Sequence, residues 1–573
     1  MDATLASLRA AGLAPKALLI SGLRTPGIQA GIVALWRRQR VKLVFTTTGF
    51  AAVGAAAGAG AAEDAATLWD ELDCPVLQMV CSSGSRRAWR ESSVGLGPRD
   101  LGMQVVLPEL DGRLLGRVVS FKEVQQRHPQ LDCPLFRYTP VLERLTWCAQ
   151  WARAWLHLAA TPPDQRRLAI VLANYPTRNS HLANGVGLDT PASVAACLGW
   201  LAAAGYGVVG DLPSDGDQLI HKLTMGRSND PRSLPLAPLA HLPLRAYEAW
   251  FAQLPAPARQ AVLERWGAPA QDDHLEAEGF AIHGCCFGAV VVLIQPSRGY
   301  ERDPQLSYHS PNLPPTHHYL ATYHWLQTVH RADGVIHFGK HGNLEWLPGK
   351  GVGLSSSCFP DLALGPIPHL YPFIVNDPGE GAQAKRRSQA LILDHLTPPL
   401  ARAGLHGREA ILEQRLDEYW QALQLGSSRA PHLRRELDAL LAALHLDTEG
   451  DLDQRLEQAD GYLCELKEAQ IRTGLHRYGV APEPQQRLEL LLALARCPRG
   501  DQPGLTQAMA LDLGLALDPW TSEEGAALSQ QDRQRLNLPV TARCAGDAMA
   551  ILEDWGLALL AGQATAPGPR SRH

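Results

Sequence analysis

Short runs of consecutive apolar residues recur along the first 400 positions, separated by longer stretches whose apolar side chains have helical spacing. The runs that we expect to be strands are ALLIS (17–21), VKLVFTT (41–47), PVLQMVC (75–81), MQVVLP (103–108), LAIVLA (168–173), the end of ASVAACLGWLAAAGYGVVG (192–210), AVVVLI (289–294), GVIHF (334–338) and YPFIV (371–375). Runs without alternation are typical of strands buried on both faces of a parallel sheet. The pattern therefore predicts an α/β, multidomain fold with parallel-sheet layers around a central cleft.

After position 400 the apolar residues follow a helical period and strand-like runs become rare. This change predicts an α/β domain over 1–160, a second α/β domain over 161–400, and a mainly helical region over 401–560. The last residues, 561–573, are rich in Pro, Ser and Arg and are expected to be disordered.

Composition excludes only a few classes of protein. The 573 residues carry a formal charge of −5, which gives no reason to expect a nucleic-acid partner. The eleven cysteines include no C-x-x-C pair, and the chain start lacks a signal-peptide pattern, so we expect a reducing cytoplasm. No run of about 18 apolar residues occurs, so no membrane span is expected.

Three polar segments directly follow predicted strands: NYPTRNS (174–180), QPSRGYERD (295–303) and HFGKHGNLEW (337–346). In open α/β folds, ligands bind beyond the carboxyl ends of the strands. We therefore expect these three segments to converge on one cleft.

The third of these segments has the densest chemistry. His337, His341 and Glu345 are four residues apart, but the surrounding glycines and prolines disfavour a long helix. Two imidazoles and a carboxylate suit a divalent transition metal held with open coordination positions. Unrelated hydrogen bonds of loop residues would explain the same spacing, because H-x-x-x-H is a weak motif. The absence of H-E-x-x-H argues against a zinc protease.

Two other segments could bind a ligand. Tyr308 lies in a proline-rich loop, whereas the aromatic residues of the following predicted helix (319–330) are better explained as core. A helix is expected to begin near position 380, with Lys385 and Arg386 one to two turns in; such a helix end can hold a carboxylate. A solvated basic turn is the alternative. No phosphate-binding G-x-x-x-x-G-K-[ST] loop occurs, so any ATP should be hydrolysed on another chain.

The segment HFGKHGNLEWLPGKGVGLSSSCFPDLALGPIPHLYPFIVNDPGEGAQAKRR resembles the signature of the large subunit of cobaltochelatase (CobN type), and more weakly that of magnesium chelatase. Matching stretches in the same order include VVLPELDGRLLGRVVSFK, IVLANYPTRNSHLANGVGLDTPAS and YLCELKEAQIRTGLHRYG. The resemblance implies a ligase that inserts Co²⁺ into hydrogenobyrinic acid a,c-diamide in aerobic cobalamin biosynthesis. It also implies two AAA+-type partner subunits that hydrolyse ATP with Mg²⁺.

The metal and the completeness of the protein stay open. PGEGAQAKRR and LILDHLTPPL favour the cobalt type; insertion of Mg²⁺ into protoporphyrin IX is the alternative. The chain is also much shorter than the family's large subunit. We expect it to be inactive without its partner subunits and a C-terminal half, which a separate gene could encode. A truncated, non-catalytic tetrapyrrole-binding paralogue and a metallohydrolase are the other hypotheses.

Within that resemblance, residue type suggests individual roles. His337, His341 and Glu345 are the candidate metal ligands, with Glu345 as the preferred proton acceptor and His341 as the second choice. The remaining candidates would clamp substrate carboxylates or pack on the ring: Arg178, Arg298, Lys340, Lys350, Lys385 and Arg386 as clamps, and Tyr308 and Trp346 as ring contacts.

Overall fold

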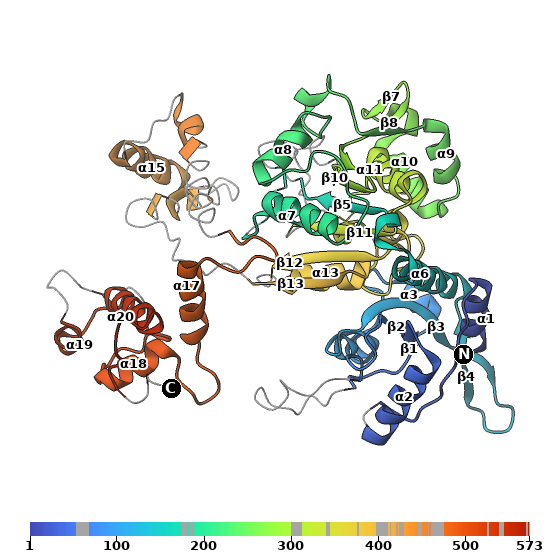
Figure 1. The fold of residues 1–573 in the computed structure, drawn as a ribbon, viewed down its shortest axis with the longest axis horizontal. Helices are drawn as coiled ribbons and strands as arrows, with labels where there is room; N and C mark the ends of the chain where they lie inside the picture. The colour runs from blue at the N-terminus through green and yellow to red at the C-terminus, as the bar shows by residue number, and fades with distance from the viewer. Residues whose placement is uncertain are drawn as a thin grey trace. The chain divides into compact units, whose positions relative to one another are not determined.

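The computed structural model divides the chain into two compact units, Met1–His395 and Leu396–His573 (Figure 1). It describes all residues except 24, 53–67, 175–181, 184, 186, 300–311, 340–343, 375–377, 397–410, 413, 417, 420–421, 423–428, 445–449, 457, 460–474, 524–525, 538–543, 569–570 and 572–573. None of the described helices is long and apolar enough to cross a membrane.

The first sheet has the strand order β1-β2-β3-β4. Strands β1 (Val44–Thr46), β2 (Val76–Ser82) and β3 (Leu114–Arg127) run parallel, and β4 (Pro134–Pro140) returns antiparallel. Helix α6 (Leu142–Ala160) packs on β3 and on α1 (Asp2–Ala10). The predicted strands at 41–47 and 75–81 are thus confirmed, whereas β3 and β4 were not predicted.

The second sheet has the order β13-β12-β11-β5-β10-β9. Its strands are β5 (Leu168–Leu172), β9 (Gly284–Phe287), β10 (Val290–Ile294), β11 (Gly334–Phe338), β12 (His369–Ile374) and β13 (Leu391–His395). All neighbours pair in parallel except β9, which is antiparallel to β10. Every residue of β5, β10 and β11 is buried, as expected for central parallel strands covered on both faces.

Three predicted strands are wrong. Residues 17–21 are described but form no strand, and Leu18 and Leu19 are exposed instead of entering a sheet. Residues 103–108 lie in helical turns, η1 (Gly102–Val106) and α5 (Leu107–Glu109). There Val105 and Pro108 are buried while Val106 is exposed, so the burial has a helical period. Residues 206–209 follow helix α7 (Thr190–Ala203) as irregular chain.

A small antiparallel sheet, β6-β8-β7, and several helices complete the first unit. Its strands are β6 (Ala240–Leu242), β7 (Leu275–Glu276) and β8 (Gly279–Ile282). Figure 1 shows β7 and β8 beside helices α9 (Leu244–Phe251) and α10 (Ala256–Trp266). Helix α11 (His317–Trp325) and its continuation η7 (Leu326–His330) form the predicted aromatic helix, and Tyr319, Tyr323 and Trp325 are buried.

The second unit is built from helices in the part of it that the structure describes. The longer ones are α15 (Ala430–Leu444), α17 (Pro484–Ala495), α18 (Leu505–Leu513) and α20 (Ala545–Leu560). The α/β class with a mainly helical C-terminal region is therefore confirmed. Part of the tail that we expected to be disordered is ordered: Ser571 is buried, and its backbone N–H and Oγ donate to Asp512 at 2.9 and 2.8 Å.

Candidate functional site

The carboxyl ends of strands β10, β5 and β11 lie side by side at one edge of the second sheet. Leu172, the last residue of β5, pairs with Ile294 of β10 on one side and with Phe338 of β11 on the other. From β5 the chain goes to β10 on one side of the sheet, and later strands build outward from β11 on the other side. Such a reversal of strand order is where open α/β sheets bind ligands. The three strand ends are therefore neighbours, as the expected convergence requires. Convergence of the three polar segments on one cleft stays a prediction, because much of each segment lies outside the described residues.

A buried chain of hydrogen bonds begins at this edge. His337 Nδ1 lies 2.8 Å from His369 Nε2, and His369 Nδ1 lies 3.2 Å from the carbonyl oxygen of Ser388. His337 Nε2 lies 3.1 Å from Tyr323 Oη and 3.1 Å from Gln295 Oε1. These residues come from five separate segments, so the network ties the strand ends of β10 and β11 to helix α11, to the start of β12 and to the end of helix α13 (Pro378–Ser388).

The contacts of His369 assign the protons in this network. A carbonyl oxygen only accepts, so His369 donates from Nδ1 and its Nε2 accepts the proton of His337 Nδ1. In this tautomer His337 Nε2 has a lone pair and can accept only from the Tyr323 hydroxyl, because Gln295 Oε1 is itself an acceptor. Burial, with the neighbouring His369, holds the pKa of His337 well below its usual value, and burial lowers that of His369 to about 4. Both rings are neutral at pH 7.

The lone pair on His337 bears on its predicted role as a metal ligand. A ligand imidazole whose other nitrogen is held by a hydrogen bond is the usual arrangement at metal sites. Here, however, Nε2 already faces the Tyr323 hydroxyl and the side-chain amide of Gln295. His337 can bind a metal directly only if the Tyr323 hydroxyl and the Gln295 side chain move away from Nε2. Direct ligation by His337 stays a prediction.

Helix α13 (Pro378–Ser388) holds the loop that carries Glu345 through the side chain of Arg387. Glu345 lies in the short turn η8 (Leu344–Trp346) and is fully buried. Arg387 donates to the carbonyl oxygens of Glu345 (2.5 Å), Leu347 (2.8 Å) and Lys350 (3.1 Å). Three carbonyls on one guanidinium hold the backbone from Glu345 to Lys350 in place.

Two buried arginines share the surroundings of the Glu345 carboxylate. Arg298, just beyond β10, is fully buried and donates to the carbonyl oxygen of Leu313 at 3.0 Å. Burial is the main reason that the pKa of Tyr319 is raised; the charges of Arg298 and Glu345 act on the same phenol in opposite directions. The charges of Glu345 and Arg298 also act on Arg387, whose pKa is lowered mainly by burial. The charges of Arg298 and Glu345 thus act on the same two buried groups, Tyr319 and Arg387. A shared site for Arg298 and Glu345 stays a prediction.

Most of the other predicted clamps that lie within the described residues have protein partners. The Lys350 Nζ donates to the carbonyl oxygens of Trp89 (2.6 Å) and Ser92 (2.5 Å) at the end of helix α3 (Arg86–Glu91). Arg386 forms a bidentate ion pair with Glu109: Nε lies 3.0 Å from Oε1, and Nη2 lies 2.8 Å from Oε2.

The indole N–H of Trp346 donates to Glu380 at 2.8 Å. Lys385 is half-buried and has no ion pair with any residue that the structure describes. The remaining candidates, Arg178, Tyr308, Lys340 and His341, lie outside the described residues.

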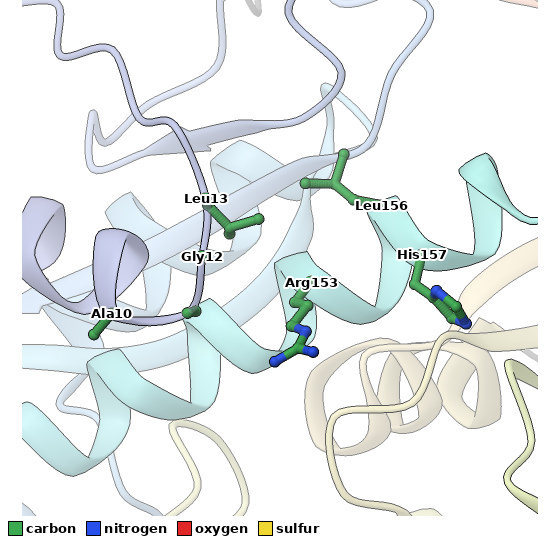
Figure 2. Close-up of a pocket in the computed structure, with 7 residues that line it drawn as sticks. Ala10, Gly12, Leu13, Arg153, Leu156 and His157 are labelled. Atoms are coloured by element: carbon green, nitrogen blue, oxygen red, sulfur yellow. The ribbon is translucent and has the colours of Figure 1, made fainter.

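A pocket of about 520 Å³ is lined by the end of α1, the residues that follow it and part of α6 (Figure 2). It is formed between α1 and α6, and Arg153 and His157 of α6 line it. The His157 Nε2 lies 3.1 Å from Asp333, which directly precedes the first residue of β11. This pocket is therefore near the amino ends of the strands and is separate from the strand-end site.

Comparison with known proteins identifies the family. A family model described as CobN/magnesium chelatase matches residues 1–559. The chain belongs to the CobN/magnesium chelatase family. A solved structure of the catalytic subunit of cobaltochelatase from Mycobacterium tuberculosis has a TM-score of 0.71 and 36% sequence identity, covering 98% of this chain and 46% of that one.

The CobN proteins are more similar to this family member than the magnesium-chelatase proteins are. The aerobic cobaltochelatase subunit CobN of Pseudomonas aeruginosa is 47% identical over 536 residues, which cover 91% of this chain and 42% of that protein. A magnesium-chelatase subunit from Rhodobacter capsulatus is 29% identical over 507 residues, covering 86% and 40%. This chain therefore spans about two fifths of the length of these curated relatives.

Several residues of the site in this CobN/magnesium chelatase family member were not predicted from the sequence. They are Gln295, Tyr323 and His369; Arg387 was expected only as one of three basic residues of a helix that could hold an anion, and its contact with the Glu345 loop was missed. Tyr323 was assigned to the core, which is correct for its burial but leaves out its hydroxyl. The position of Gln295, directly after the strand β10, was the one available signal. His369 and Arg387 act on groups 32 and 42 residues away in the sequence, and no local pattern shows such contacts.

Proposed function

We propose that this chain is the tetrapyrrole-binding part of a cobaltochelatase large subunit, which inserts Co²⁺ into hydrogenobyrinic acid a,c-diamide. The observation that carries the proposal is the edge formed by β10, β5 and β11, where Arg298, His337 and Glu345 come from neighbouring strand ends. A flat macrocycle with several carboxylates needs such a wide edge, with cations and a proton acceptor facing it.

Insertion requires the metal to lose water and two ring nitrogens to lose protons. In our proposal Glu345 accepts a proton, because a buried carboxylate on a fixed backbone is an effective base when it is close to the reacting atom. His341 is the second candidate base, and His341 and His337 are the candidate ligands that guide the substrate metal. Weak, open coordination suits this task, since closed ligation would retain the ion.

Cobalt is favoured over magnesium by sequence similarity. The two CobN relatives are 47% and 42% identical to this chain, against 29% for the magnesium-chelatase protein of Rhodobacter capsulatus. The corresponding proposal is a cytoplasmic complex with two AAA+-type subunits that hydrolyse ATP with Mg²⁺, in which the part of the relatives not matched by this chain is supplied separately. Mg²⁺ insertion into protoporphyrin IX and non-catalytic tetrapyrrole binding are the competing proposals.

The test separates ring binding from metal insertion. Hydrogenobyrinic acid a,c-diamide and protoporphyrin IX are each titrated into the purified chain, with ring fluorescence as the readout. The proposal expects the corrinoid to bind more tightly; preference for the porphyrin would favour the magnesium type, and binding of neither would refute the proposal.

Glu345→Gln then tests the assigned base, with the ATPase subunits, the separately supplied remainder of the large subunit and Co²⁺ added. Because the amide preserves the shape but accepts no proton, ring affinity should stay within about twofold while insertion falls by at least about 100-fold. Arg153→Gln, in the pocket at the opposite edge, is the control and should insert the metal at the normal rate. Unchanged insertion by Glu345→Gln removes this residue from the mechanism.

A further inference from the structure

A second group of metal-ligating side chains lies on the small antiparallel sheet. His241 comes from β6, Glu276 ends β7, and Glu278 lies in the turn before β8. The His241 Nε2 is 2.9 Å from Glu276 Oε2 and 3.4 Å from Glu278 Oε2. One ligand atom of each residue lies within 4.8 Å of those of the other two. An imidazole and two carboxylates thus converge from three segments of one small sheet.

These separations agree with those between neighbouring ligands of one ion. Metal–nitrogen and metal–oxygen bonds of about 2.0–2.2 Å place two ligand atoms about 2.9 Å apart at a right angle and about 3.4 Å apart at a tetrahedral angle. The two measured distances from His241 Nε2 fall at these values. The two carboxylate oxygens lie within 4.8 Å of each other, so side-chain rotation has to close the third separation for one ion to reach all three residues.

The charges around the group favour a cation. Arg227 forms an ion pair with Glu276 Oε1, so the other oxygen, Oε2, remains directed toward His241. Burial raises the pKa of Glu276, but hydrogen bonds from His241 and Arg227 outweigh it and bring the value below normal. Two carboxylates and one guanidinium together contribute a net charge of −1. Arg227 would act as the outer partner that orients a carboxylate ligand.

The backbone under the group is rigid. His241 pairs with Ala281 in the β6–β8 ladder, and Glu276 pairs with Gly279 in the β7–β8 ladder. Behind this sheet the carbonyl oxygen of Ala281 contacts His318 Nε2 at 2.8 Å. The His318 ring lies 4.8 Å from the ring of His283, whose buried Nε2 has no hydrogen-bond partner among the described residues.

We propose that His241, Glu276 and Glu278 form a binding site for a divalent first-row transition-metal ion, with water in the remaining positions. Side-chain exposures of 21%, 29% and 75% leave the site accessible from solvent. Mixed nitrogen and oxygen ligands suit Co²⁺, Zn²⁺ or Mn²⁺. The site is distinct from the strand-end segment, and its occupation does not depend on chelatase activity.

Co²⁺ binding to the full-length, untagged chain tests this proposal. Equilibrium dialysis gives the number of ions bound at about pH 7.5, and visible absorption reports cobalt coordinated by nitrogen and oxygen. His241→Ala and Glu278→Gln should each weaken one class of sites by at least about tenfold, as expected when a ligand is removed. Circular dichroism checks that each variant is folded, and the exposed turn position of Glu278 makes that variant the safer one.

His432→Ala is the matched control. His432 contacts Glu436 at 3.2 Å, and Arg415 contacts the same carboxylate at 3.5 Å, which reproduces the His–Glu–Arg arrangement without the second glutamate. This variant should bind the same number of Co²⁺ ions as the wild type. The proposal is overturned if the wild type binds no Co²⁺ up to millimolar concentrations, or if Glu278→Gln and His241→Ala retain the wild-type stoichiometry and affinity.

Discussion

Asp361 is predicted to be the residue whose change most weakens the connection between the two sheets of the first unit. It lies on helix α12 (Phe359–Leu364) and accepts hydrogen bonds from Arg117 of β3 and from Arg144 of α6, the latter at 2.6 Å. The three side chains are at most 5% exposed. Asp361→Asn keeps the shape but removes the negative charge between two buried guanidinium groups.

The expected loss of stability follows from the remaining partners of the two arginines. Breaking a buried ion pair costs about 3–5 kcal/mol because it leaves an uncompensated charge. Arg117 still donates to Gln389 at 2.8 Å and lies 3.7 Å from the centre of the Trp147 ring. Arg144 keeps its ion pair with Glu143. These contacts place the expected loss at the lower end, about 3 kcal/mol, or roughly a hundredfold in the local opening equilibrium.

Hydrogen exchange followed by mass spectrometry measures this loss region by region. This method is preferable to a single melting temperature, since a chain with two compact units need not unfold in one step. Peptides from β3 and α12 should exchange about a hundredfold faster in Asp361→Asn. Glu143→Gln is the control: its carboxylate is half-exposed, so its removal should cost less than about 1 kcal/mol. Equal protection in wild type and Asp361→Asn would refute the reasoning.

Two other predictions concern stability near the site. Lys350→Met should weaken the protection of helix α3 (Arg86–Glu91) by about 1–2 kcal/mol, because the ammonium group caps its last carbonyls; unchanged exchange of residues 86–92 would contradict this. Burial lowers the pKa of His369 to about 4, against about 6.5 when unfolded, so its contribution to stability is complete above pH 6.5 and is lost as the pH falls toward 4. Protection of β12 should therefore fall by up to about 1.4 kcal/mol per pH unit between about pH 6 and 5, and His369→Asn should flatten this slope; equal slopes would contradict the assignment.

The parts of the fold that were predictable are those with strong local patterns. Strands β5, β10 and β11 are continuous apolar runs followed by polar residues, and both their burial and their shared edge follow from that pattern. Residues 103–108 are equally apolar, but they form helical turns in which only one side is buried. The strand β3 was not recognised because its second half is polar and exposed.

The side-chain roles were less predictable, because they depend on contacts distant in sequence. Lys350 looks like a substrate clamp in its glycine-rich loop, yet its partners are carbonyls about 260 residues earlier. Arg386 and Arg387 are adjacent and basic, but one pairs with Glu109 while the other holds the Glu345 loop. Only the folded chain distinguishes these two arginines.

The central claim is that the macrocycle binds at the carboxyl ends of β10, β5 and β11. The most direct test is the affinity for hydrogenobyrinic acid a,c-diamide of two charge-matched variants, Lys385→Met on helix α13 and Arg153→Met in the pocket at the opposite edge (Figure 2). We predict that Lys385→Met weakens binding by about tenfold, the equivalent of one charge-assisted contact of about 1.4 kcal/mol, and that Arg153→Met changes it by less than about twofold. Weakened binding in Arg153→Met together with normal binding in Lys385→Met would place the ring at the wrong edge of the sheet and contradict the account.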